Sequence, residues 1–222
     1  MLTVVRRADA RRLRLAIDPR TAAVRLTLPR RAAVAPALAW AAGKRAWVEA
    51  ELAGLPVARP IVPGLMFALG DDTVRLDWSE THPRQPVLVS RETLRVGGPL
   101  DALAPRVLRF LRAHAQAMLA AETQALAARH GIAIGQIGVG DQRGRWGSCS
   151  ASGDIRYSWR LILAPTFVRA STVAHEVAHR LHMDHSRAFH DAHVRILGGD
   201  PGPARAWLRA NGTALHWFGC SG

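Results

Sequence analysis

The N-terminal part of the chain alternates apolar and polar side chains, a period that is typical of strands with one buried face. Residues 12–17 and 23–28 both follow this pattern, and a turn sequence at 18–21 separates them. We therefore expect a β-hairpin with one buried face and one arginine-rich face in water. The spacing of the apolar residues then changes to that of a helix over residues 36–54.

Short strands are predicted again between residues 57 and 97, at 66–69, 74–78, 86–89 and 93–96. The run Gly97-Gly98-Pro99 that follows is the best candidate for a domain boundary. It divides the chain into an N-terminal β-rich subdomain with one helix (residues 1–98) and a second domain (residues 99–222). Because the joining segment is short, we expect packed subdomains rather than independent ones.

The second half begins with a helix predicted over residues 101–130, where apolar residues recur at helical spacing. A strand is expected at 132–139, and a hairpin follows whose second strand covers 155–163. Pro165 stops this strand and leads into a helix that contains two histidines. The sequence shows no internal repeat or low-complexity segment.

The most informative stretch is the histidine pair in this helix, His175 and His179. Side chains four residues apart on a helix lie on one face about one turn apart, so the two imidazoles can share a metal ion. Glu176 lies beside the first histidine, where its carboxylate can reach a water molecule at the metal rather than the metal itself. The surrounding apolar residues predict a buried helix, and a metal would satisfy the inward-facing polar pair. An ordinary amphipathic helix with two incidental histidines is the competing interpretation.

A catalytic zinc takes three protein ligands and keeps a fourth position open, so one more ligand is needed. Four further histidines are available, namely His182, His185, His190 and His193. Three ligands in one helical row cannot surround a metal tetrahedrally, which argues against His182. A break at Met183-Asp184, with Ser186 as the N-cap of a new helix, would return His185 to the metal from another direction. We therefore expect His185 as the third ligand, ahead of His190 and His182, and leave the role of His193 open.

Such a site would support hydrolysis. Zinc lowers the pKa of water toward about 7, and Glu176 can accept the proton as a general base and then return it as a general acid. The edge of the predicted strand 155–163 could align an extended peptide beside the metal through main-chain hydrogen bonds. An oxyanion partner should also exist. Tyr157, Arg145 and Arg160 are candidates, although hairpin packing and surface charge explain these residues equally well.

The composition limits the possible partners and locations. A formal net charge of +13 and a pI of about 11.6 favour a polyanion such as DNA or a nucleotide, but the basic residues are spread along the chain. No apolar run approaches the roughly 20 residues that span a bilayer, so we expect no membrane association. Residues 1–7 lack the apolar core of a secretory signal, and two cysteines are too few for a disulfide framework. We therefore expect a cytoplasmic protein.

Three motifs carry a resemblance to a known family. They are Arg145-Trp-Gly-Ser-Cys-Ser150, Ser158-Trp-Arg-Leu-Ile-Leu-Ala-Pro165, and His175-Glu-Val-Ala-His179 followed by His185, Ser186 and Phe189. Together they resemble the YgjP-like metallopeptidase family, which is itself similar to the SprT-like zincins. The resemblance implies an α+β fold with a zincin-like, minigluzincin-type catalytic domain, whose HExxH helix packs on a small antiparallel sheet. It also implies zinc held by His175, His179 and His185, with Glu176 as the catalytic residue.

The leading hypothesis is a zinc-dependent hydrolase, specifically a metallopeptidase that acts on a peptide or protein. One alternative is a metal-dependent nucleoside triphosphate pyrophosphatase, because abundant arginine suits a polyphosphate. The sequence has no P-loop, however, and three histidines suit zinc better than magnesium. Another alternative is a DNA-associated, SprT-like protease. The chain departs from the usual family motif at His190, where a tryptophan normally follows the phenylalanine, and the substrate stays open.

Overall fold

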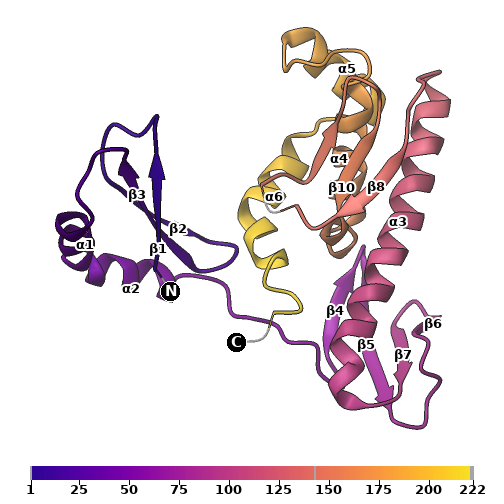
Figure 1. Cartoon of the computed structure of the whole chain (residues 1–222). Helices are drawn as coiled ribbons and strands as arrows, with labels where there is room; N and C mark the ends of the chain where they lie inside the picture. Colours follow the sequence, from indigo (N-terminus) through magenta and orange to yellow (C-terminus); the bar gives the residue numbers. More distant parts are fainter. Residues whose placement is uncertain (1, 143, 221–222) are drawn as a thin grey trace. The chain divides into compact units, whose positions relative to one another are not determined.

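The computed structural model describes residues 2–142 and 144–220 (Figure 1). The chain forms two compact units, Met1–Ala58 and Arg59–Gly222. Residues 97–99, where the sequence suggests a boundary, lie within the second unit, at the end of strand β7 (Thr93–Gly97). The strands predicted between residues 57 and 97 therefore belong to the same compact unit as the histidine helix.

The first unit contains a three-stranded sheet in the order β1-β3-β2. Strands β2 (Arg14–Asp18) and β3 (Ala23–Pro29) are antiparallel and confirm the predicted hairpin. Strand β1 (Leu2–Arg7), which we did not predict, pairs in parallel with the other side of β3. The hairpin is thus part of a larger sheet.

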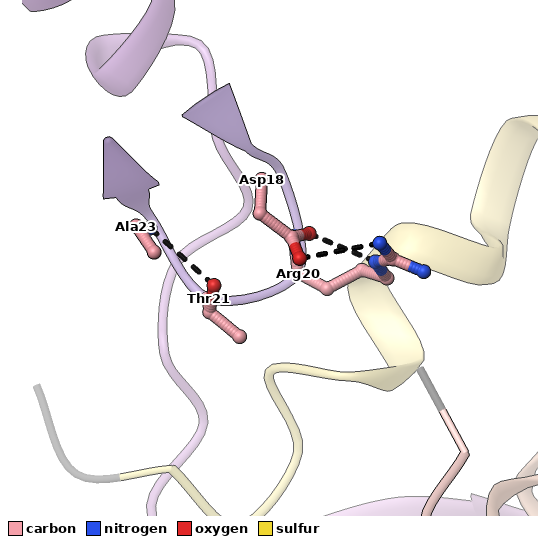
Figure 2. Close-up of polar contacts among 4 residues, drawn as sticks. All are labelled: Asp18, Arg20, Thr21 and Ala23. Carbon is pink, nitrogen blue, oxygen red and sulfur yellow. Dashed lines mark hydrogen bonds and ion pairs between the residues drawn. The ribbon is translucent and has the colours of Figure 1, made fainter. Parts of the chain in front are cut away.

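The turn between β2 and β3 is held by its own side chains, as Figure 2 shows. The Asp18 carboxylate accepts hydrogen bonds from the Arg20 guanidinium at 2.8 and 3.2 Å. Thr21 Oγ1 accepts a hydrogen bond from the backbone N–H of Ala23 at 3.3 Å. Asp18 also accepts a hydrogen bond from the backbone N–H of Arg20 at 3.0 Å. Aspartate and threonine are favoured in turns because they can bond to nearby backbone in this way.

The segment predicted as one helix in the first unit is two helices, α1 (Val34–Ala42) and α2 (Arg45–Ala53). The interruption falls at Gly43 and Lys44, where glycine disfavours a continuous helix. The core of this unit is small, and its buried residues are Leu26 and Leu28 of β3 with Ala37 and Ala41 of α1.

The second unit begins with a four-stranded sheet in the order β4-β5-β7-β6. Its strands are β4 (Met66–Leu69), β5 (Asp72–Ser79), β6 (Val87–Ser90) and β7. They confirm the four predicted strands, with ends that differ slightly. The two central strands are parallel and each outer pair is antiparallel.

The long helix α3 (Leu103–Arg129) confirms the predicted helix and follows a short 3-10 helix, η1 (Leu100–Ala102). In Figure 1 it runs along the second unit, and it contacts β7, β8 and α4. A stripe of residues spaced by four is fully buried along it, namely Leu103, Val107, Leu111, Ala115 and Leu119. This helix therefore joins the four-stranded sheet to the elements that carry the histidines.

A second sheet packs beside the histidine helix, in the order β8-β10-β9. Its strands are β8 (Ile137–Gly140), β9 (Gly147–Cys149) and β10 (Ile155–Ser158). The central strand β10 is parallel to β8 and antiparallel to β9. The sheet is therefore mixed, and the expectation of a small antiparallel sheet was wrong.

The strand predicted over residues 155–163 is shorter than expected. It ends at Ser158, and the next residues form a buried 3-10 helix, η2 (Trp159–Leu163). Ser158 pairs with Gly140, the last residue of β8, so no neighbouring strand continues past this point. Without partners the backbone must satisfy its own hydrogen bonds, and a 3-10 turn does so.

Three helices complete the second unit, α4 (Thr166–Ala178), α5 (Arg187–Leu197) and α6 (Gly202–Leu215). Helix α4 is the central one, because it contacts α3, α5, α6 and β9. The described residues thus form an α+β fold of six α-helices and small sheets. Among them, no helix combines the length and the apolar character that crossing a membrane requires.

An ion pair between Glu122 of α3 and Arg169 of α4 links these two helices. The Arg169 side chain is 6% exposed, and its Nη2 lies 2.8 Å from Glu122 Oε1. Replacing Glu122 with alanine leaves a buried guanidinium without this partner, so we expect the free energy of unfolding to fall by about 3 kcal/mol. Urea unfolding followed by circular dichroism measures the change.

The matched control is Asp191→Ala, which removes a carboxylate from the exposed pair that Asp191 forms with Arg187 at 4.0 Å. Exposed pairs of this kind contribute less than about 0.5 kcal/mol. An equally small loss in Glu122→Ala would show that the α3–α4 ion pair is not a significant source of stability.

Candidate metal centre

Helix α4 holds the two histidines of the HExxH motif at its C-terminal end. Its hydrophobic residues Val173, Ala174, Val177 and Ala178 are buried, so the helix is fixed in the core of the second unit. His175 is half-buried and His179 is 9% exposed. Their ring centroids lie 4.9 Å apart. The predicted pairing of these side chains on one helix face is therefore present.

The chain leaves the helix earlier than the sequence suggested. Ala178 is the last helical residue and His179 is the C-cap, whereas we expected a break near Met183-Asp184. A tight turn follows, in which the backbone N–H of Arg180 donates to the carbonyl of Val177 at 3.0 Å. The loop after this turn is what brings residue 185 back toward α4.

Ser186 begins the next helix, as predicted. Its hydroxyl accepts a hydrogen bond from the backbone N–H of Phe189 at 3.5 Å, which caps α5. The side chain of Asp184 in turn accepts a hydrogen bond from the backbone N–H of Ser186 at 3.3 Å. These two bonds fix the backbone on both sides of His185. Its position relative to α4 is therefore set by local sequence.

The structure brings His185 together with the helix pair. His185 Nε2 lies 3.2 Å from His175 Nε2, and the ligand atoms of His175, His179 and His185 all lie within 4.8 Å of one another. The other histidines take different places. The His190 ring is 6.5 Å from the His185 ring, His182 contributes its backbone carbonyl to His179, and His193 donates from Nε2 to the carbonyl of Ser171 at 3.0 Å.

The chemistry of this cluster fits a metal ion. Burial, together with the neighbouring imidazoles, lowers the pKa of His175 to about 3, and burial also lowers the pKa of His179. Both rings are therefore neutral at neutral pH, which is the form that binds metals. His179 Nδ1 donates to the carbonyl of His182 at 3.2 Å, and this bond leaves the lone pair on Nε2. The 3.2 Å between the Nε2 atoms of His175 and His185 is short enough for one metal ion to bind both.

Glu176 is buried next to the cluster, with 3% of its surface exposed. Burial raises its pKa to about 7, and the guanidinium of Arg145 opposes this rise. Among the described residues, its Oε2 has no hydrogen-bond partner. A buried carboxyl oxygen without a partner is costly unless another group uses it. Glu176 therefore lines the pocket beside the histidine cluster with one carboxyl oxygen that has no partner among the described residues.

Strand β9 lies directly against Glu176. A Cβ atom added to Gly147 would be 2.3 Å from Glu176 Oε1, so only glycine allows the strand to pass this close. Because β10 is paired on both sides, the strand that we expected to align a substrate has no free edge. The outer strand on the Glu176 side is β9, which corrects that expectation.

Two of the three residues suggested as oxyanion partners have other roles. Tyr157 is fully buried, its hydroxyl is 3.1 Å from Thr123 Oγ1, and burial raises its pKa. Arg160 is also buried, and it donates to the carbonyl of Leu215 at 3.0 Å and pairs with Asp141. Both suggestions were wrong because these side chains bond within the core. Arg145 is the one of the three that lines the site.

A pocket of about 250 Å³ opens beside His175 and Glu176. It contains residues for which the sequence indicated no function: Trp146, Ser171, Thr172, His193, Ala204, Arg205 and Leu208. His193 had a visible signal, as a further histidine after the motif. Ser171 and Thr172 lie on α4 itself, one turn before the histidine pair. The remaining residues come from the segment before β9 and from α6, whose packing against α4 no local pattern predicts.

Comparison with known proteins identifies the family of the chain. No curated protein and no solved structure gives a significant match to the sequence. The family model of the YgjP-like metallopeptidase domain matches residues 11–211 of the 222-residue chain. This range includes the three clustered histidines and Glu176. The chain therefore belongs to the YgjP-like metallopeptidase family.

Proposed function

We propose that this protein is a zinc-dependent metallopeptidase in which His175, His179 and His185 hold the metal and Glu176 is the general base. The observation that carries this proposal is the convergence of three histidine side chains next to a buried carboxyl oxygen that has no partner. Membership of a metallopeptidase family supports a hydrolytic role and peptide substrates.

The donor set favours zinc over other common metal ions. Three neutral imidazoles with a fourth position left open are typical of catalytic zinc, whereas magnesium and calcium prefer oxygen ligands. The His182 carbonyl also orients the His179 ring, as hydrogen-bond acceptors commonly do for metal-binding histidines. A metal-dependent pyrophosphatase that relies on magnesium is accordingly disfavoured.

When bound, zinc supplies a Lewis acid that lowers the pKa of water toward about 7 and polarises a carbonyl oxygen. Glu176 accepts a proton from the attacking water and then delivers it to the leaving amine nitrogen. Its burial strengthens it as a base, and a nearby cation would keep it ionised before the reaction. Arg145, which lines the site, can stabilise negative charge that develops on the substrate.

The outer strand β9 provides a means to align the substrate. In the part of the chain that the structure describes, the sheet order leaves one edge of β9 without a neighbouring strand. Gly147 brings this strand against Glu176. An extended peptide that pairs with the free edge through main-chain hydrogen bonds would have its backbone next to the base.

The test is to offer short peptides and nucleoside triphosphates in parallel to the purified, zinc-loaded full chain. We expect peptide hydrolysis that stops when the metal is removed with a chelator and returns when zinc is added back. Phosphate or pyrophosphate release from nucleotides, with no peptide cleaved, would replace the peptidase assignment with the pyrophosphatase alternative.

Gly147 offers a second prediction. In Gly147→Ala, the new methyl group would occupy the position of the Glu176 carboxylate and force that side chain to move. Since a misplacement of about 1 Å can cost about 100-fold in rate, we expect kcat/KM for peptides to fall by about that factor. Zinc content should not change.

The matched control is Gly138→Ala in strand β8 of the same sheet, where an added Cβ has no atom within 4 Å. This variant should keep its activity. If Gly147→Ala were as active as Gly138→Ala, the contact between β9 and Glu176 would not control the reaction.

A further inference from the structure

We propose that the pocket beside Glu176 selects substrates that carry an acidic residue, aspartate or glutamate, next to the bond that is cut. This inference rests on the proposed peptidase function and names the substrate class of that site. It is carried by two arginine side chains, Arg145 before β9 and Arg205 of α6. Both line the pocket that His175 and Glu176 also line.

The position of the pocket decides which part of a substrate enters it. His175 and Glu176 both belong to its lining, so the pocket is continuous with the site of hydrolysis. A substrate whose scissile bond reaches Glu176 must therefore place an adjacent side chain here. The volume of about 250 Å³ accommodates one side chain of moderate size rather than a longer segment.

The charge of the pocket is positive. Arg145 and Arg205 are exposed, and neither side chain forms an ion pair or a hydrogen bond with another residue in the described part of the chain. Glu176 is the one carboxylate among the lining residues, and the reaction uses it.

Part of the pocket wall is apolar. The ring of Trp146 packs on the backbone of α6, where a Cβ added at Gly212 would lie 2.9 Å from it, and its centroid is 5.2 Å from the His216 ring. Ala204 and Leu208 extend this surface along α6. His193 also lines the pocket, and the hydrogen bond between its Nε2 and the carbonyl of Ser171 fixes its ring.

These features together favour a carboxylate over other side chains. An apolar residue in the pocket would remove water from the two guanidinium groups without replacing its hydrogen bonds, which is unfavourable. A lysine or arginine would be repelled. A carboxylate between two guanidinium groups can accept charge-assisted hydrogen bonds while its methylene groups contact the tryptophan wall.

The test measures binding, so that it does not depend on hydrolysis. The zinc-loaded Glu176→Gln protein is titrated into three fluorescein-labelled peptides that are identical except for one central residue, which is aspartate, asparagine or lysine. Fluorescence anisotropy gives each Kd. We expect the aspartate peptide to bind about tenfold more tightly than the asparagine peptide, and the lysine peptide to bind most weakly.

Variants separate pocket recognition from attraction by the net charge of +13. Arg205→Ala should reduce the preference for aspartate over asparagine to about threefold or less. In Arg205→Glu the lysine peptide should bind more tightly than the aspartate peptide. Arg195→Ala is the control, because Arg195 is exposed on α5, carries the same charge and does not line this pocket. It should keep the full preference.

Equal Kd values for the aspartate and asparagine peptides would overturn the proposal. So would an equal loss of preference in Arg195→Ala and Arg205→Ala, because that result assigns the effect to net charge. A failure of the proposed function gives a different result, because the wild-type protein would then cleave no peptide. The binding preference is measured separately and does not depend on cleavage.

Discussion

Replacing His185 with alanine should release zinc from the protein and abolish hydrolysis. His185 is the proposed ligand that comes from the loop after α4 and its C-cap, and its Nε2 lies 3.2 Å from His175 Nε2. Removing a group that only hydrogen-bonds to a metal ligand lowers metal affinity by about 10- to 100-fold. Removing a ligand itself should lower the affinity by more. Elemental analysis after dialysis should find about one zinc per chain in the wild type and close to none in His185→Ala.

The matched control is His190→Ala, which removes an exposed histidine whose ring lies 6.5 Å from that of His185. This variant should keep its zinc, and both variants should keep the fold, because neither side chain is part of the core. Zinc that survived in His185→Ala but was lost in His190→Ala would transfer the ligand role to His190. Circular dichroism spectra establish that any loss of metal does not come from unfolding.

The cluster could be predicted from the sequence because each of its parts has a local signal. Spacing by four on a helix placed His175 and His179 together, and a serine at position 186 indicated a new helix directly after His185. The exact end of α4 had no such signal. The helix ends at His179 without a glycine or proline, in a turn that the Arg180 side chain supports by donating to the carbonyls of Ala133 and Ala151 at 3.1 Å.

The substrate side of the site was harder to predict, because it depends on which strand is outermost. Period-two alternation in β10 correctly indicates that Ile155 and Tyr157 share a buried face, and this already argues against Tyr157 as a site residue. Nothing in that pattern says that β10 is central and β9 is outer. Likewise, Arg205 looks like any exposed charge on an amphipathic helix until α6 is packed beside Glu176.

Replacing Glu176 with glutamine should leave zinc in place and remove most of the activity. Glutamine has nearly the same shape as glutamate, so the fold and the packing against Gly147 should be preserved. It cannot accept a proton from water, and loss of a general base costs about 10²- to 10⁴-fold in rate. We therefore expect kcat for peptide hydrolysis to fall by about 10³-fold with KM little changed, measured with a quenched fluorescent peptide.

This variant separates the two roles that the HExxH motif combines. Because Glu176 carries no ligand atom in the histidine cluster, zinc content in Glu176→Gln should equal that of the wild type. Glu92→Gln, which changes an exposed glutamate in the same unit, should retain full activity. If Glu176→Gln hydrolysed peptides at the wild-type rate, another group would have to accept the proton. If it lost zinc as His185→Ala does, the carboxylate would belong to the metal's ligands and the separation of roles would be wrong.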